Sequence, residues 1–536
     1  MSAFTQVKAL RPGRNVFDLS YEKKFDFDIG QIIPVCCEEM VPGDTFKIGN
    51  EMVINAHPLN APVYHSINAY VHYFFVPTRL IFDGWEDFIT GGIDGNDSTV
   101  LPRFYKNGSS IPAELTAEDV CGPFSLYDYF GFPILKNSSD NYDIPGGGVN
   151  SPSYPTFFFR PLSFPWRCYN LVWNEYYRDE TLQDEVDIDQ PLVLNRNWSK
   201  DYFTSALPFQ QRGTSPALPL SGTAPVLFTA DPSDVPDLGL MIGGVGGSGP
   251  LGPDDVNYND SEGVLPASAR GHRGYVSFES AATFDVSDLR LAFQLQKFME
   301  RAAVGGVRYT EFLTSFFGVA PTDARLQRPE YLGGSKSPIL INQVTQTSES
   351  GSTPQGTLRG KGITADKNFI CSYTASEFGY LCGFLSVLPM PSYQQGVDKK
   401  WLRKSKIDFF FPPFAHLSEE PVLEEQIYAF PGTSKEDGIG NDTVFGFQAP
   451  YNDLRMNQNK VCGSLRSVLN YWHAGRIFDS APSLNSDFIT CDSSRDHLDR
   501  IFAVQNVPGL ICNFANIITG IRPIPKYGEP GFIDHN

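Results

Sequence analysis

The chain has 536 residues, of which 41% are hydrophobic and 13% aromatic, and it contains 48 Gly and 41 Pro. So many turn-forming residues favour short strands joined by turns and long connections over a mainly helical protein. The net charge of −19 argues against a protein whose whole surface binds nucleic acid, because attraction to phosphates needs clustered Lys and Arg.

The beginning of the chain differs from the rest in charge. Its first 24 residues hold five basic side chains against two acidic ones, and they show little apolar periodicity. We therefore expect residues 1–30 to form an extended arm that wraps a neighbour or lines an interior. No apolar run precedes Lys8, so no secretory signal is expected. Nine cysteines without a CxxC pair indicate a reduced, intracellular chain.

The clearest predicted element is a strand over residues 67–76, which Pro77 ends. Its side chains alternate between two faces, and both faces carry large apolar or aromatic groups. We therefore expect both faces to be covered. The two sets are Ile67, Ala69, Val71, Tyr73 and Phe75 on one face, and Asn68, Tyr70, His72, Phe74 and Val76 on the other. Beyond them Ile81, Trp85 and Phe88 recur at helical spacing and predict a short helix over the end of the sheet.

The other predicted elements follow from periodicity and from Gly and Pro breaks. Helices are expected at residues 166–182, 285–306 and 307–317, with Ser287 as the cap of the second. The second and third helices are expected to plug one side of a sandwich. Loops are expected at 94–161 and 345–367. Strands are expected at 32–41, before a turn at 42–44, and at 52–63, 339–344, 368–390, 406–412 and 423–430.

Residues 213–274 predict a solvent-exposed insertion. They contain twelve Gly, eight Pro and seven acidic side chains, so they can bury little core. Gly244, Gly246 and Gly249 fit GxGxxG by count, but Pro250 follows and no helix opens there. We therefore predict no nucleotide site in this segment.

Motifs of catalysis and metal binding are absent from the sequence: there is no HExxH, GxSxG, Walker loop or EF-hand series. His57, His65 and His72 lie on an edge and a strand where three ligands cannot easily converge, so no metal or cofactor is predicted. Carboxylates assembled in space, as in a glycosidase, would leave no linear pattern. A carbohydrate-binding or carbohydrate-cleaving β-sandwich therefore stays open as an alternative.

One basic and aromatic cluster lies at residues 397–411. Basic groups that hold phosphates beside an aromatic ring that stacks a base are typical of sequence-tolerant single-strand binding. We hypothesise that this cluster and the basic arm face an enclosed nucleic acid. The alternative is a basic strand edge with Trp401 in the core. The DNA-facing candidates are Lys8, Arg11, Arg14, Lys399, Lys400, Trp401, Arg403 and Lys404.

Several strings in order along the chain resemble the major capsid protein of microviruses, particularly the gokushovirus branch. They include NVFDLS at Asn15, VPGDTF at Val41, YFFVPTRLIFDGWEDF at Tyr73 and YNLVWNEYYRDE at Tyr169. They continue with GGVRYTEFL at Gly305, QRPEYLGG at Gln327, VFGFQAPYNDLR at Val444 and RPIPKYGEP at Arg522. No single string is diagnostic, but the number and order of the strings make a chance similarity implausible.

This resemblance implies a fold dominated by β-structure. It implies one eight-stranded antiparallel jelly-roll β-sandwich spanning 1–536, with long inter-strand insertions that contain several helices. It also implies a structural, non-enzymatic subunit, sixty copies of which close an icosahedral shell around circular single-stranded DNA. A small basic DNA-binding viral protein is expected to help neutralise the genome.

The same resemblance implies that an inserted loop builds protrusions at the threefold axes and contacts a host-cell receptor. Residues 213–274 are the candidate, with Asp231, Asp234, Asp237, Asp254 and Asp255 as possible contact residues. The expected location is the virion, assembled in the host bacterial cytoplasm and without membrane insertion.

Overall fold

A computed structural model describes most of the chain. The described residues are 13–92, 99–104, 115, 119–120, 122–133, 161–214, 226–229, 273–276, 286–306, 308–345, 356, 358–415, 419–429, 443–504 and 507–526. The chain divides into a main unit, residues 1–210 with 302–536, and a second unit, residues 211–301.

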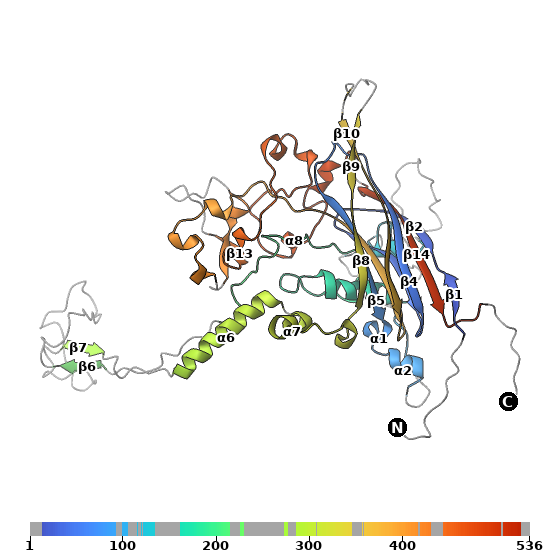
Figure 1. The fold of residues 1–536 in the computed structure, drawn as a ribbon, viewed down its shortest axis with the longest axis horizontal. Helices are drawn as coiled ribbons and strands as arrows, with labels where there is room; N and C mark the ends of the chain where they lie inside the picture. The colour runs from blue at the N-terminus through green and yellow to red at the C-terminus, as the bar shows by residue number, and fades with distance from the viewer. Residues whose placement is uncertain are drawn as a thin grey trace, which may run out of the picture. The chain divides into compact units, whose positions relative to one another are not determined.

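The main unit is built from antiparallel strands in two large sheets (Figure 1). One sheet has the order β1-β14-β4-β10-β9, with β2 also paired to β14; the other has the order β3-β11-β5-β8. Their bounds are β1 Asn15–Asp18, β2 Tyr21–Phe27, β3 Ile32–Met40, β4 Thr45–Ala56, β5 Ile67–Pro77, β8 Glu330–Pro338, β9 Leu340–Thr345, β10 Leu358–Thr374, β11 Gly379–Pro389 and β14 Leu510–Arg522. A small separate sheet pairs β12 Glu420–Leu423 with β13 Val444–Gln448.

The main core lies between the two large sheets, as in a β-sandwich. Alternate side chains of β5, from Ile67 to Phe75, meet apolar side chains of β4 and β14, among them Ile48 and Phe514. The opposite face of β5 belongs to a second core, in which Phe74 and Val76 pack with Trp166 of α5. Both faces of β5 are therefore buried, which confirms the prediction from its alternation.

The turn between β3 and β4 follows from its residue types. Gly43 has a φ of +92°, a conformation that favours Gly. The Asp44 carboxylate accepts the Val41 N–H at 3.0 Å and pairs with Arg522 of β14 at 2.9 Å. The predicted turn at 42–44 is thus confirmed, and it is tied to the neighbouring strand.

Short helices cover the outer face of the four-stranded sheet and its end (Figure 1). Residues 164–177 run as a helix with a final π turn, close to the predicted helix at 166–182. The remaining helices are mostly single turns. The bounds are α1 Thr78–Ile81, α2 Trp85–Thr90, α4 Leu126–Tyr129, α5 Phe164–Val172 with a π turn at Trp173–Tyr177, α7 Tyr309–Phe317 and α8 Ser486–Ile489. No helix among the described residues is both long and apolar enough to cross a bilayer.

Several sequence-based expectations were wrong. The helix predicted around Trp85 is two short helices, α1 and α2, and the strand predicted to begin at 52 begins at Thr45. Residues 358–367, predicted as loop, belong to β10, because one of its faces is exposed and therefore reads as polar. Residues 406–408, predicted as strand, form a 3₁₀ turn. Neither β8 nor β14 was predicted.

The expected arm, residues 1–30, is described from residue 13 onward. There β1 and β2 pair with β14 of the same chain. Its first twelve residues, which include Lys8 and Arg11, lie outside the described residues.

The second unit contains most of α6 Val286–Gly305, as predicted for 285–306. Ser287 lies within the first turn of this helix, so it is not the N-cap. Leu291, Leu295 and Phe298, which recur at helical spacing along α6, are exposed, so they form no core. β6 Val226–Thr229 pairs with β7 Arg273–Val276. Most of the predicted insertion at 213–274, with its five aspartates, lies outside the described residues.

Candidate functional site

The basic and aromatic cluster lies at the surface of the main unit and is not a strand. Its beginning, Lys399–Trp401, is a 3₁₀ turn, and a second 3₁₀ turn follows at Lys406–Asp408. Trp401 is 73% exposed. The alternative of a basic strand edge with Trp401 in the core is therefore wrong.

Acidic partners pair with three of the basic side chains of this cluster. Lys399 pairs with Glu420, Lys400 with Asp398 at 3.3 Å, and Arg403 with Asp453 at 2.8 Å. Burial would raise the pKa of Asp398, but hydrogen bonds from Lys460 and Lys400 outweigh burial and lower that pKa. The cluster thus offers phosphate groups much less positive charge than its sequence suggests.

The remaining DNA-facing candidates are placed as follows. The main-chain N–H of Lys404 donates to the Asp408 carboxylate at 2.7 Å, at the start of the second turn. Arg14 is exposed just before β1. The structure therefore places Lys399, Lys400, Trp401, Arg403 and Lys404 on one segment, whereas Arg14 lies just before β1, which pairs with β14.

The histidines considered for zinc have other partners. His65 Nε2 lies 2.6 Å from the Met390 carbonyl oxygen, and His72 Nδ1 lies 2.8 Å from the Tyr177 hydroxyl. Burial lowers the pKa of both to about 4, and for His72 the nearby Arg196 guanidinium contributes to this lowering. Within the described ranges no group of three or more His, Cys, Asp or Glu is placed to hold a metal ion.

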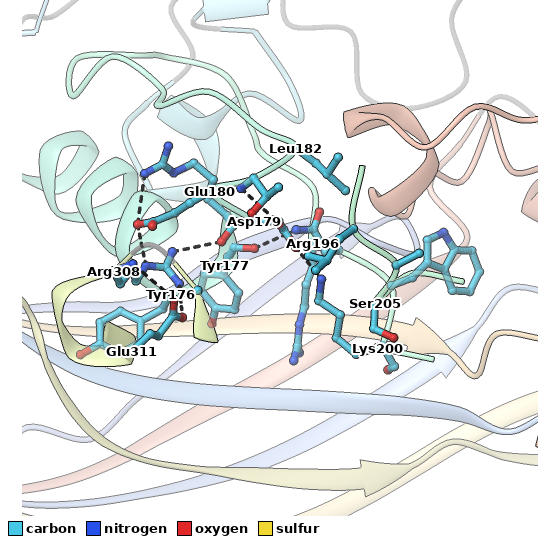
Figure 2. Close-up of a pocket in the computed structure, with 18 of the residues that line it drawn as sticks. Tyr176, Tyr177, Asp179, Glu180, Leu182, Arg196, Lys200, Ser205, Arg308 and Glu311 are labelled. Atoms are coloured by element: carbon cyan, nitrogen blue, oxygen red, sulfur yellow. Dashed lines mark hydrogen bonds and ion pairs between the residues drawn. The ribbon is translucent and has the colours of Figure 1, made fainter. Parts of the chain in front are cut away.

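Sequence reasoning missed a cavity of about 800 Å³ in the main unit (Figure 2). It lies where the loop after α5 faces β5 and residues 303–311. The Arg196 guanidinium lies 4.4 Å from the Tyr70 ring centre and 5.7 Å from that of Tyr177, and it donates to Ser386 Oγ at 3.0 Å. No linear motif could have predicted this cavity, because the residues that line it come from segments far apart in the sequence.

Ion pairs fix the walls of this cavity. Glu180 forms ion pairs with Arg308 at 3.0 Å and with Arg178 at 3.5 Å, and Lys200 pairs with Asp179. Asp179 and Glu180 therefore both pair with basic groups. Burial raises the pKa of Tyr177, so its hydroxyl stays neutral. The described lining residues thus brace a loop and present no activated nucleophile.

The family of the chain follows from comparison with known proteins. Residues 5–532 match the family model described as "Capsid protein (F protein)". The chain belongs to this capsid protein family. It is 32% identical to capsid protein VP1 of Chlamydia phage 1, 30% to that of Bdellovibrio phage phiMH2K and 29% to that of Spiroplasma virus 4. Each comparison covers 98% of this chain and 97% of the relative.

Membership of the capsid protein family settles the broad function. The chain is a structural major capsid protein of a bacteriophage, and not an enzyme. The resemblance to gokushovirus capsid proteins drawn from the sequence is confirmed. The family match argues against the alternative of a carbohydrate-binding or carbohydrate-cleaving β-sandwich.

Proposed function

We propose that sixty copies of this chain assemble into a small icosahedral shell that encloses circular single-stranded DNA. The observation that carries this proposal is the match to a capsid family over residues 5–532. Such a shell needs one subunit that contacts copies of itself on several sides. Assembly would take place in the bacterial cytoplasm, and the mature location would be the virion.

The fold that we propose for the shell subunit is an eight-stranded jelly roll. The strand orders β2-β14-β4-β10 and β3-β11-β5-β8 support it. Consecutive strands β2, β3, β4 and β5 alternate between the two sheets, as do β10 and β11, and two interlocked Greek keys produce this alternation. In this reading β1 and β9 are additional edge strands.

Neutralisation of the genome calls for a second protein. The chain carries a net charge of −19, and acidic neighbours pair with Lys399, Lys400 and Arg403. DNA phosphates need basic counter-charges. We therefore infer a small basic DNA-binding partner, with the arm that carries Lys8, Arg11 and Arg14 as the part of this chain that reaches the DNA.

Host attachment is assigned to the insertion at 213–274, with its five aspartates as contact candidates. The pairing of β6 with β7 supports a loop here, because it brings residues 229 and 273 side by side, so the segment between them leaves and returns at one place. A receptor at the host surface would be the partner.

Expression of the chain with the basic partner tests the shell proposal. We expect closed particles in electron micrographs, rapid sedimentation, and nuclease-protected single-stranded DNA in the particles. A chain that remains a monomer under every assembly condition would contradict the proposal.

A further inference from the structure

A second feature of the main unit is an exposed apolar surface beside the basic cluster. We call it the aromatic surface. It consists of large side chains from two segments, each between 37% and 73% exposed: Trp401, Ile407, Phe409, Phe410, Phe411, Leu454 and Met456.

Specific contacts hold the two segments of the aromatic surface together. The Phe410 and Tyr451 rings lie edge to face, 5.2 Å apart, and the Tyr451 hydroxyl donates to the Ile407 carbonyl oxygen at 3.2 Å. Arg403 pairs with Asp453 and lies 5.0 Å from the Phe409 ring centre. The surface is therefore preorganised by its own chain, which lowers the entropic cost of binding a partner.

The backbone at Tyr451 supports this reading. Its φ is +58°, a left-handed conformation that a residue with a side chain seldom adopts. Such a conformation persists only where its surroundings hold it. Here the ring contact with Phe410, the hydrogen bond to the Ile407 carbonyl oxygen and a main-chain hydrogen bond to the Glu420 carboxylate surround Tyr451.

The area of the aromatic surface fits a protein partner. Seven large residues, each between 37% and 73% exposed, leave several hundred Å² accessible, which is the order of the roughly 800 Å² that one side of a standard protein interface buries. Monomeric proteins seldom expose an apolar patch of this size without a binding role. A contact here would cover most of one interface.

The charge of the surroundings argues against DNA as the occupant. Lys399, Lys400 and Arg403 each have an acidic partner, so these three side chains attract phosphates less than unpaired cations would. Protein interfaces typically have an apolar centre and a polar rim, and here the neighbouring polar groups have partners in their own chain.

We infer that the aromatic surface is a contact between neighbouring copies of this chain. The inference rests on the proposed shell, in which copies of the chain are the most abundant protein neighbours. Trp401, the most exposed ring, inserts into the neighbouring copy as an anchor.

Serine substitutions test the inference in the full-length chain. Trp401→Ser and Phe409→Ser are expected to lower the yield of particles at least about tenfold, since anchor residues at interfaces carry losses of this size. Trp401→Phe, which keeps a ring, is expected to lose much less. Far-ultraviolet circular dichroism and thermal unfolding of the unassembled chain should not change, because both side chains are largely exposed.

Val468→Ser is the matched control. Val468 is 77% exposed and lies outside the aromatic surface, so its replacement should leave particle yield unchanged. An equal loss with Val468→Ser would overturn the assignment. If the unsubstituted chain forms no particles, the shell proposal fails; if it forms them and Trp401→Ser does so equally well, only the interface fails.

A photocrosslinker identifies the occupant directly. p-Benzoylphenylalanine at position 401 in assembled particles is expected to give a covalent dimer of the chain, with the linked peptide located by mass spectrometry. Crosslinks to DNA alone, or only within one chain, would overturn the inference.

Discussion

At the scale of single residues, one buried amide connects the two large sheets. Asn516 of β14 is fully buried, accepts from the Tyr73 hydroxyl of β5 at 3.1 Å and donates to the Val35 carbonyl oxygen of β3 at 2.8 Å. Asn516→Leu would leave both partners without a hydrogen bond. We predict a loss of about 2–4 kcal/mol in the free energy of unfolding, measured by chemical denaturation of the unassembled chain.

Tyr73→Phe provides the control for that variant. It removes only one donor and should cost less than Asn516→Leu. Because the two side chains contact each other, the double variant should lose less than the sum of the single losses. Additive losses would show that the amide does not act through Tyr73.

Two buried histidines predict how stability depends on pH. The pKa values of His65 and His72 are about 4 in the folded chain and about 6.5 in the unfolded chain. Below pH 6.5 the unfolded chain binds protons that the folded chain does not, so stability is lost as the pH falls towards 4. Each histidine contributes a loss of about 3 kcal/mol by pH 4.

Thermal unfolding midpoints between pH 7 and pH 4 test this dependence. His65→Gln with His72→Gln should make the midpoint fall less steeply with pH than in the unsubstituted chain. His497→Gln, at an exposed histidine, is the matched control. An unchanged slope in the double variant would contradict the prediction.

At the scale of elements, both faces of β5 are buried, so a charge placed on either face should prevent folding. Val71 lies in the core between the sheets and Val76 in the core beneath the helices, and both are fully buried. Val71→Asp and Val76→Asp should each prevent folding, because an unpaired buried charge costs several kcal/mol. Phe369→Asp on β10, where the side chain is 71% exposed, should leave soluble expression intact. Soluble yield measures all three.

The elements also show what the sequence could reveal. β5 could be predicted from the sequence because both of its faces carry large apolar or aromatic groups and the strand ends at Pro77. β14 was missed because Asn513 and Asn516 interrupt its apolar pattern, although Asn516 points into the core. β10 was read as loop over 358–367 because one of its faces is exposed and reads as polar. From Ile363 onward it also pairs with β4, about 300 positions away, and pairing over such a distance leaves no local signal.

The candidate site shows the same limit. The basic run at 399–404 is plain in the sequence, but its acidic partners Glu420 and Asp453 come from later segments. Only the folded chain reveals that they cancel its charge. The aromatic surface likewise combines 401–411 with Leu454 and Met456, which no linear motif connects.

At the scale of the whole molecule, the two-unit division predicts that the insertion is dispensable for folding. Deletion of residues 219–270 leaves every strand of the two large sheets in place. We expect an unchanged thermal midpoint for the main unit and shells that still close, but poor attachment to host cells. Electron microscopy and adsorption assays measure these outcomes. Failure to fold would show that the segment is part of the core.

The position of β14 constrains how the molecule is made. It lies between β4 and the first strands, β1 and β2, yet it is synthesised some 490 residues after them. At bacterial elongation rates of about 5–20 residues per second, β14 is synthesised roughly half a minute or more after β1 and β2. A prematurely released polypeptide therefore lacks the strand that joins its first two strands to the rest of the sheet.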